Sequence, residues 1–284
     1  MIVIADSGST KTDWRIIYGP GRIEQVEGLG LNPNFHTPKN FLQTIIDTLS
    51  KYEGVEEAKH IYFYGAGCFT VDKNTMVKNS LAEFFKVGKI QVYHDLLGAA
   101  RAACLKKEGI TAILGTGSNS CSFNGKEIIQ NFPSGGFIIG DEGGGVNIGR
   151  RVLKSFIEGY MPNELRERFE FQYRLSIDDI LRNLYENKYP NRFMASFSHF
   201  AHRHKENPFM AQQIIQEFES FFDHQILRFS QAKEWPLNAV GSIAYYYHEY
   251  LEVVAESRGV KIGNIIEKPI AALSLYHVHE LAEQ

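Results

Sequence analysis

A short apolar segment followed by a turn of small polar residues occurs twice in this chain, and this repeat limits the available folds more than any other feature. Residues 2–5 are apolar and precede a turn at 7–11, and residues 110–114 precede a similar turn at 115–120. In each half the turn leads into further strand-like segments. We interpret the repeat as an internal structural duplication with a boundary near residue 108.

Segments with helical spacing alternate with strand-like segments in the rest of the chain. Residues 145–232 are mostly helical in pattern. Alternation of strands and helices predicts an α/β fold. The predicted domains are residues 1–108 and residues 109–284, the second with a helical insertion at about 155–235. A terminal helix at 269–284 is a candidate to pack back on the first domain.

Charge and cysteine content exclude several classes of function. The chain of 284 residues has a formal net charge of -3, which gives no indication of a nucleic-acid partner, since such partners usually leave a basic patch. Cys68, Cys104 and Cys121 are too few and too scattered for a disulfide framework or, by themselves, for a zinc or iron–sulfur site; buried, reduced thiols are expected. With no leader peptide and no apolar stretch near the ~20 residues of a membrane span, a cytoplasmic protein without a membrane partner is expected.

The first turn has the composition of a phosphate-binding loop. Small residues let backbone N–H groups approach an anion, and hydroxyl groups add further donors. Asp6, at the end of the apolar segment, is a candidate ligand of Mg²⁺, which usually takes one or two carboxylates in proteins. The alternative is a simple hairpin turn. The candidate phosphate-binding residues are Gly8, Ser9, Thr10, Lys11 and Thr12.

The second turn supports this interpretation of the first. Two such turns, each between strand-like segments, suit two lobes that hold the phosphates of ATP from opposite sides. The chain has no Walker loop, and each turn leads into a strand, whereas the dinucleotide-binding fingerprint opens a helix. The candidate residues in the second turn are Gly115, Thr116, Gly117 and Ser118.

Two further segments carry candidate acceptor carboxylates. Residues 135–145 are so rich in glycine that their backbone is expected to approach a ligand, and Asp141 and Glu142 within them are candidate acceptors for sugar hydroxyl groups. Asp95 follows a strand and precedes a helix, which is where α/β proteins form ligand sites. It could take the proton of an attacking hydroxyl group, or it could serve only to cap the helix. The neighbouring His94 is expected to be a bystander.

Three motifs in order resemble those of the sugar kinase/actin/Hsp70 superfamily. Residues 6–13 resemble its first phosphate motif, residues 113–120 its second, and residues 240–244 its adenosine motif. More narrowly, the chain resembles the BadF/BadG/BcrA/BcrD ATPase family and, within it, the N-acetylglucosamine kinase-like proteins. The resemblance is weakest over 155–235. It implies a two-lobed, actin-like ATPase fold, a duplicated ribonuclease H-like α/β architecture with a nucleotide cleft between the lobes.

The resemblance also implies roles for single residues. Asp95 matches the catalytic base of the family. Sugar contacts are implied for Asn32, Asn119, Gly135, Gly136 and Asp141. Nucleotide contacts are implied for Thr10, Thr116 and Gly241, and Ser242 lies in the same adenosine motif.

Three positions depart from the family pattern. Ser9 stands where glycine is often found, which a turn tolerates. Phe137 stands where an N-acetylglucosamine kinase often has tryptophan, and residues 144–146 are richer in glycine than usual. Because the last two adjoin the predicted sugar pocket, the identity of the sugar stays open.

The sequence therefore predicts an ATP- and Mg²⁺-dependent kinase that acts on an amino sugar, with N-acetylglucosamine 6-phosphate as the product implied by the family. The expected partner is a small sugar, and whether the helical insertion forms a homodimer interface is left open. One alternative is an activator-type ATPase related to dehydratase activators, against which the scattered cysteines argue. Others are a non-catalytic sugar sensor on the same fold and, more remotely, an actin-like filament protein.

Overall fold

The chain is divided into two compact units, which are described one after the other. The computed structural model describes residues 1–19, 21–86 and 88–282. The first unit comprises residues 1–106, 125–127 and 268–284, and the second comprises 107–124 and 128–267. The chain changes unit close to the predicted boundary at 108. The terminal segment groups with the first unit.

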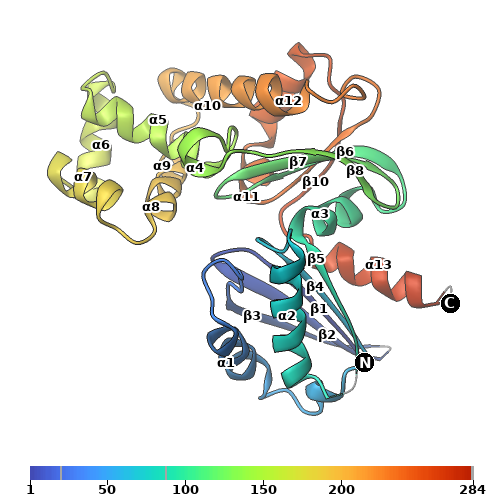
Figure 1. Ribbon diagram of the computed structural model, residues 1–284. Helices are drawn as coiled ribbons and strands as arrows, with labels where there is room; N and C mark the ends of the chain where they lie inside the picture. Colours follow the sequence, from blue (N-terminus) through green and yellow to red (C-terminus); the bar gives the residue numbers. More distant parts are fainter. Residues whose placement is uncertain (20, 87, 283–284) are drawn as a thin grey trace. The chain divides into compact units, whose positions relative to one another are not determined.

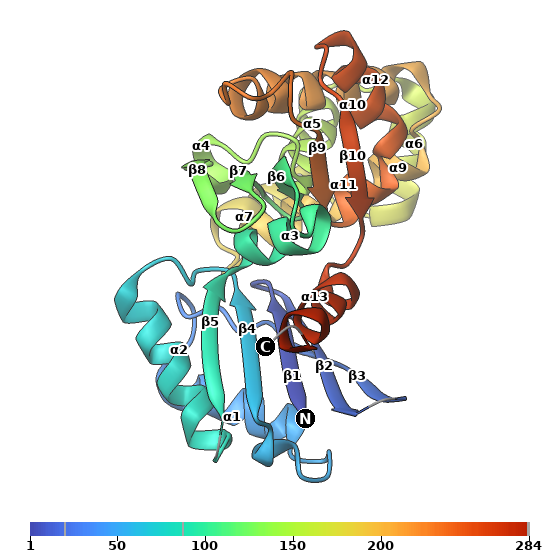
Figure 2. The same cartoon turned by 90° about the vertical axis from the view of Figure 1, so that its right-hand side faces the viewer.

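The first unit is built on a mixed five-stranded sheet (Figures 1 and 2). The strand order is β3-β2-β1-β4-β5, in which β2 is antiparallel to both β1 and β3, while β1, β4 and β5 run parallel. The strands are β1 (Ile2–Ser7), β2 (Lys11–Gly19), β3 (Arg22–Leu29), β4 (His60–Gly65) and β5 (Lys89–His94). The carboxyl ends of the three parallel strands therefore lie at one edge of the sheet.

Helices cover both faces of this sheet, as the side-chain alternation of its central strand requires. Val3 and Ala5 face a core shared with α1 (Pro38–Leu49) and α2 (Val71–Phe84). Ile4 faces the opposite core, shared with α3 (Asp95–Cys104) and α13 (Ile270–Ala282). A 3₁₀ turn, η1 (Val55–Glu57), precedes β4. Residues 283–284 of the predicted terminal helix lie outside the described residues.

The second unit repeats the topology of the first sheet. Its strands are β6 (Glu108–Leu114), β7 (Ser118–Asn124), β8 (Ile128–Phe132), β9 (Leu237–Val240) and β10 (Ile262–Ile266). The order β10-β9-β6-β7-β8 places an antiparallel meander on one side of β6 and parallel strands on the other, as around β1. The predicted duplication and α/β class are confirmed.

Helices account for most of the remaining second unit. They are α4 (Gly136–Ile139), α5 (Gly145–Ile157), α6 (Asn163–Tyr173), α7 (Ile177–Tyr185), α8 (Pro190–Ser196), α9 (Ser198–Arg203), α10 (Pro208–Phe221), the π-helical turn η2 (Phe222–Ile226), α11 (Ser242–Tyr246) and α12 (His248–Ser257). Ser176 caps α7 in a capping box with Asp179, and Pro208 opens α10 after the cap residue Asn207. Aromatic side chains fill the core beneath α6, α8 and α9.

Helix ends differ from expectation in two places. The composition of residues 96–107 predicts a helix over that range, but α3 ends at Cys104, because Leu105 takes a positive φ of 57° and β6 begins soon after it. The pattern of residues 243–258 likewise predicts one helix, which the structure breaks at Tyr247 into α11 and α12. Periodicity does not reveal either break, since the apolar pattern continues across both.

The remaining expectations about the chain as a whole concern cysteines and membranes. All three cysteines are buried and none is in a disulfide, as predicted. Within residues 1–19, 21–86 and 88–282, no helix combines the length and apolar character needed to span a bilayer.

Replacing Phe169 by alanine is expected to lower the free energy of unfolding by about 3–5 kcal/mol, because it removes a fully buried ring. The ring packs against Phe156, Phe197 and Phe200, with centroids 4.4, 5.6 and 5.4 Å away. Phe171→Ala, on the same helix but 79% exposed, is the matched control and should change it by less than about 0.5 kcal/mol. Equal losses in a urea titration of the two variants would contradict this packing.

Candidate active site

The turn between β1 and β2 is held by hydroxyl groups that point into the protein. Ser7 and Thr12 are the last residue pair of the two strands, and their side-chain oxygens lie 2.7 Å apart. The Thr12 hydroxyl donates to the carbonyl of Leu29 at 2.9 Å, and the Leu31 N–H donates to Ser7 Oγ at 2.9 Å. The Thr12 side chain, predicted to bind phosphate, is thus fully buried and engaged within the protein.

The tip of this turn is more accessible than its base. Thr10 and Lys11 are exposed, and Gly8 and Ser9 are half-buried. The Gly8 N–H donates to the Lys11 carbonyl at 3.0 Å, which closes the turn, and the Gly30 N–H donates to the Thr10 carbonyl at 3.1 Å. The tip therefore keeps a fixed shape while Thr10 and Lys11 reach solvent.

Asn32, the predicted sugar-contacting asparagine, lies against this turn. It is 5% exposed, and its Nδ2 donates to Ser9 Oγ at 2.7 Å. Its Oδ1 accepts from the Asn34 N–H at 2.9 Å, and a Cβ added to Gly67 would come within 2.5 Å of that oxygen. The loop after β4 therefore packs on Asn32, and the structure brings the predicted sugar and phosphate segments of the first unit together.

Asp6 and Asp95 lie at the same edge of the first sheet. Asp6 pairs in register with Tyr64 of β4, which pairs with Tyr93 of β5, and Asp95 begins α3 two residues later. β1 and β5 are two strand spacings apart, or about 10 Å. Burial, followed by the negative charges of Asp95 and Asp13, raises the pKa of Asp6 to about 7, against a smaller opposing effect of Lys11. The two carboxylates therefore repel each other across a poorly solvated edge.

Asp95 is oriented by its immediate neighbours. Its Oδ1 accepts from the Leu96 N–H at 2.8 Å and lies 3.1 Å from His94 Nε2. Burial raises the pKa of Asp95, while His94 and that backbone N–H act in the opposite direction. His94, expected to be a bystander, is in direct contact with the carboxylate, and the exposed Phe69 ring meets the histidine edge-on at 6.2 Å.

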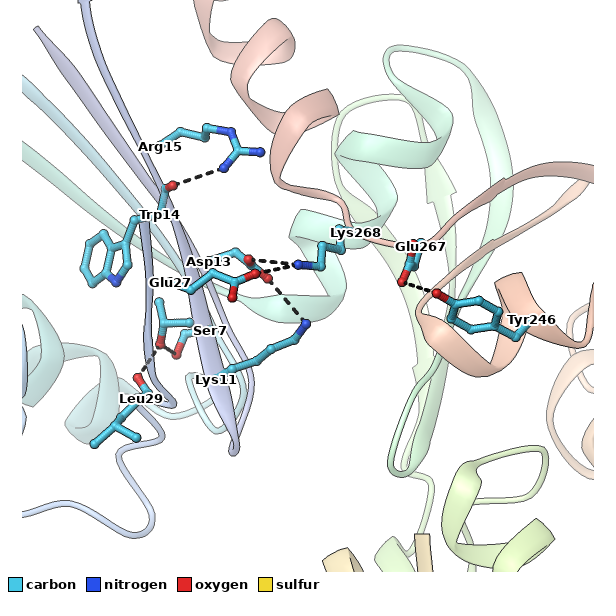
Figure 3. A network of polar contacts seen from close by, with 11 residues as sticks. Ser7, Lys11, Asp13, Trp14, Arg15, Glu27, Leu29, Tyr246, Glu267 and Lys268 are labelled. Atoms are coloured by element: carbon cyan, nitrogen blue, oxygen red, sulfur yellow. Dashed lines mark hydrogen bonds and ion pairs between the residues drawn. The ribbon is translucent and has the colours of Figure 1, made fainter. Parts of the chain in front are cut away.

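Sequence reasoning missed an ion-pair network at the base of the first turn (Figure 3). Lys268, just before α13, lies 3.5 Å from Asp13 and 2.7 Å from Glu27, and Lys11 lies 3.8 Å from Asp13. The hydrogen bond to Glu27 is the main cause that raises the pKa of Lys268. The two lysines balance the charges of Asp13 and Glu27, and because Asp13 pairs in register with Asp6, this network lies beside the strand that ends in the first turn.

The second turn is tied to the start of α5 by backbone hydrogen bonds. The Gly115 N–H donates to the Gly117 carbonyl at 3.0 Å, closing the turn. The N–H groups of Gly145 and Val146 donate to the carbonyls of Gly115 and Thr116 at 2.8 and 2.9 Å. These donors belong to the first turn of a helix, whose N–H groups have no partner inside the helix, so the turn satisfies them.

Asp141 lies directly behind the second turn. A Cβ added to Gly117 would collide with the Asp141 carboxylate, so only glycine permits this approach. Burial raises the pKa of Asp141, whereas hydrogen bonds from the Ser118 N–H and the Ser134 side chain act to lower it. Gly135 and Gly136, with φ of 77° and 69°, form the bend into α4 just before Asp141.

The other predicted residues of the second unit also lie near this turn. Asn119 Oδ1 accepts from Asn131 Nδ2 and from the Ser120 N–H, both at 2.9 Å. A Cβ added to Gly241, just after β9, would collide with the carbonyl oxygen of Leu114, the residue just before the second turn, and Ser242 opens α11. The structure thus groups the predicted adenosine, phosphate and sugar residues of this unit.

The protein ligands for a divalent cation are few. Among the described residues, no group of three or more His, Cys, Asp or Glu side chains is placed to hold a metal ion. Asp6 nevertheless fits Mg²⁺, which takes one or two carboxylates and keeps several waters. Burial, followed by the charges of Asp95 and Asp13, raises the pKa of Asp6, and a bound cation would offset all three effects.

The chain is similar to proteins that carry one kind of name, although no protein-family model matches it. It is 38% identical to a solved structure from Porphyromonas gingivalis, the "Putative N-acetylglucosamine Kinase". The match covers 99% of this chain and 100% of that one, with a TM-score of 0.94. A protein of the same designation from Chromobacterium violaceum shares the fold at 15% identity, with 97% and 98% coverage and a TM-score of 0.78.

A curated relative carries a related name. The N-acetylmuramic acid/N-acetylglucosamine kinase of Clostridium acetobutylicum is 27% identical over 167 residues, which is 56% of this chain. The match spans 55% of that protein, or about half the length of the curated relative.

Asp6→Asn is expected to stabilise the protein increasingly as the pH rises from 4 to 8 in EDTA. Between the ordinary value of 3.8 and the folded pKa of about 7, the native state keeps a proton that the unfolded chain releases. The free energy of unfolding of the unmodified protein therefore falls across this window, and the variant lacks that loss. Thermal unfolding at several pH values measures it.

The control for this experiment is Asp47→Asn, an exposed carboxylate on α1. Its difference from the unmodified protein should stay constant with pH. A constant difference for Asp6→Asn as well would contradict the raised pKa.

Proposed function

The chain belongs to the family of N-acetylglucosamine kinase-like proteins with the sugar kinase and actin-like fold, and on this premise we propose that it is an ATP-dependent kinase acting on an amino sugar. The observation that carries the proposal is the placement of Asp95 beside Asp6 at the carboxyl edge of the first sheet. A kinase of this kind needs one carboxylate to accept a proton and another beside the phosphate charge.

Asp95 acts as the general base in this proposal. A sugar hydroxyl oxygen attacks the γ-phosphorus, the bond from phosphorus to the bridging oxygen of ADP breaks, and the hydroxyl proton passes to Asp95. A carboxylate whose pKa is raised by burial is a stronger base than one in water, and general bases contribute about 10²–10⁴-fold to rate. His94 Nε2 and the Leu96 N–H keep the Asp95 carboxylate in one orientation.

Asp6 holds Mg²⁺ in this proposal, with water for the remaining positions, and Asp95 keeps its role as the base. When bound, the ion neutralises charge on the phosphate oxygens. Lys11, which is exposed at the tip of the first turn and lies 3.8 Å from Asp13, is a further candidate to contact an anionic ligand.

The two turns supply the proposed phosphate contacts. In the first, Ser9 and Thr10 are the proposed donors at the accessible tip next to Gly8, whereas the Thr12 side chain supports the turn from inside. In the second, residues 115–118 are the proposed contacts, of which Thr116 is exposed while the N–H groups of Gly115 and Ser118 bind acceptors within the protein. Gly241 and Ser242 are proposed to contact the adenosine. That both turns contact one nucleotide is a prediction from the sequence.

The proposed sugar is N-acetylglucosamine, phosphorylated at its 6-hydroxyl group. The names of the similar proteins support this choice, and one of those names also includes N-acetylmuramic acid. Asn32 and Asn119 are proposed sugar contacts with Gly135, Gly136 and Asp141. Placement within the BadF/BadG/BcrA/BcrD family is likewise proposed, on the motifs of the sequence.

The alternative of a cluster-bearing activator ATPase receives no support from the cysteines. Cys68 is buried, and burial raises its pKa to about 12, which disfavours the thiolate that ligates iron. Cys104 and Cys121 are also buried. A non-catalytic sensor would bind sugar without turnover, and the following assay separates it from a kinase.

Release of ADP from Mg²⁺–ATP should depend on one amino sugar and should fall about 10²–10⁴-fold in Asp95→Asn. The panel contains N-acetylglucosamine, glucosamine, N-acetylmannosamine, N-acetylmuramic acid and glucose. Asp72→Asn is the matched control, because Asp72 also lies in the first turn of a helix but is exposed on α2. Its rate should stay within twofold of the unmodified protein.

Two results would overturn the proposal. Turnover of no sugar above the sugar-free rate would exclude these substrates and favour a sensor. Full activity of Asp95→Asn would exclude Asp95 as the base.

A further inference from the structure

One face of α10 and the π-helical turn η2 contacts both the second turn and the glycine-rich loop, defined here as residues 140–145. Helix α10 packs against α5 and α12 in the second unit (Figure 1). Glu217 and Phe221 are four residues apart and so share a helix face. Gln225 follows in η2. Turns of π-helix are rare in proteins, and those that occur are often found at functional sites.

Glu217 holds the middle of the glycine-rich loop. It is 4% exposed, and its Oε1 accepts from the Gly143 N–H at 3.0 Å. Its Oε2 accepts from Arg151 Nε at 2.6 Å, so the buried charge is compensated. Gly143 has a φ of 78°, and a Cβ there would lie 2.9 Å from Phe221, so the loop backbone is pressed against the helix.

Gln225 joins the loop to the second turn. It is 5% exposed, and its Nε2 donates to Ser118 Oγ at 2.8 Å and to Glu142 Oε2 at 3.0 Å. The two hydrogens of the buried Gln225 amide are therefore both used, one in a bond to the second turn and the other in a bond to the glycine-rich loop. An unpaired buried donor or acceptor costs about 1–3 kcal/mol, so the arrangement resists any separate movement of the two segments.

Asp141 lies between the segments that these side chains hold. Its carboxylate accepts from the Ser118 N–H, and its carbonyl accepts from the Gly144 N–H at 3.0 Å. Neither Glu217 nor Gln225 needs to contact a ligand to affect this carboxylate, because each fixes a residue one or two positions away from it.

We propose that Gln225 and Glu217 are positioning residues that hold the second turn and Asp141 in one geometry for phosphoryl transfer. The proposal rests on the proposed function. The proposal gives the helical insertion a role: Glu217 and Gln225, near its end, hold the second turn and the glycine-rich loop of the same unit in place. Misplacement of a reacting group by about 1 Å can cost 10²-fold in rate, so the support should affect kcat more than ground-state binding.

Gln225→Met, which keeps the approximate shape but removes both donors, is expected to lower kcat about ten- to hundredfold. KM for ATP should change less than threefold, at a temperature where circular dichroism shows the variant fully folded. Asp223→Asn is the control in the same π-helical turn, since Asp223 pairs with Arg258 at the surface, 3.0 Å away. Its kcat should not change. A wild-type kcat in Gln225→Met would overturn the proposal.

Glu217 offers a conservative rescue. Glu217→Gln keeps an oxygen that can accept from the Gly143 N–H and should retain more than half of kcat, whereas Glu217→Leu should lose about tenfold or more. Equal kcat losses in both variants would show that the Arg151 ion pair matters and the hold on Gly143 does not, which contradicts the proposal.

Hydrogen exchange separates failure of this inference from failure of the proposed function. In Gln225→Met without ligand, amides of 115–118 and 140–145 should exchange faster than in the unmodified protein, and those of the first turn should not. If the unmodified protein phosphorylates no sugar of the panel, the proposed function fails, but the exchange result still tests whether Gln225 holds the two segments. Unchanged exchange in both segments would overturn the positioning role of Gln225.

Discussion

The burial of two carboxylates, Asp6 and Asp95, at one edge of the first sheet is the constraint on which the account of this site depends. Parallel pairing of β1, β4 and β5 brings two carboxylates to one poorly solvated edge, and the pKa of Asp6 rises to about 7 as a result. A fold gains nothing in stability from such an arrangement, because neutral side chains would avoid the cost. Carboxylates brought together at a loss of stability are typical of sites that bind a cation or transfer a proton.

The two halves of the chain share a sheet topology but support their turns in different ways. In the first unit, the buried hydroxyl groups of Ser7 and Thr12 hold the turn, and Lys268 and Lys11 form ion pairs with Asp13 on the next strand. In the second, the N–H groups at the start of α5 hold the turn. Duplication thus supplied two equivalent strand–turn–strand frames, and each unit adds its own local support.

Local sequence patterns were sufficient to predict the strands, the turns and the duplication. The turn residues 7–11 and 115–120 combine small size with apolar strands before them, and Ser176 with Asp179 marks a helix start by itself. These features depend on residues close together in the chain, so a single sequence contains the information needed to find them.

Most parts of the candidate site that sequence reasoning missed come from distant segments. Gln225 reaches Ser118 across 107 positions, and Lys268 reaches Glu27 across 241. Neither lies in a motif, and a π-helical turn gives no periodic signal that would single out Gln225. His94 was expected to be a bystander, yet it contacts the carboxylate of Asp95, the next residue in the chain.

The proposed function carries the sequence-based prediction that both turns contact the phosphates of one nucleotide, and amide hydrogen exchange with and without Mg²⁺–AMPPNP tests this claim most directly. The account predicts slower exchange in the presence of the nucleotide for peptides that cover 7–12 and for peptides that cover 115–119. A surface peptide of α7 should be unaffected. Protection of only one turn, or of neither, would contradict the claim.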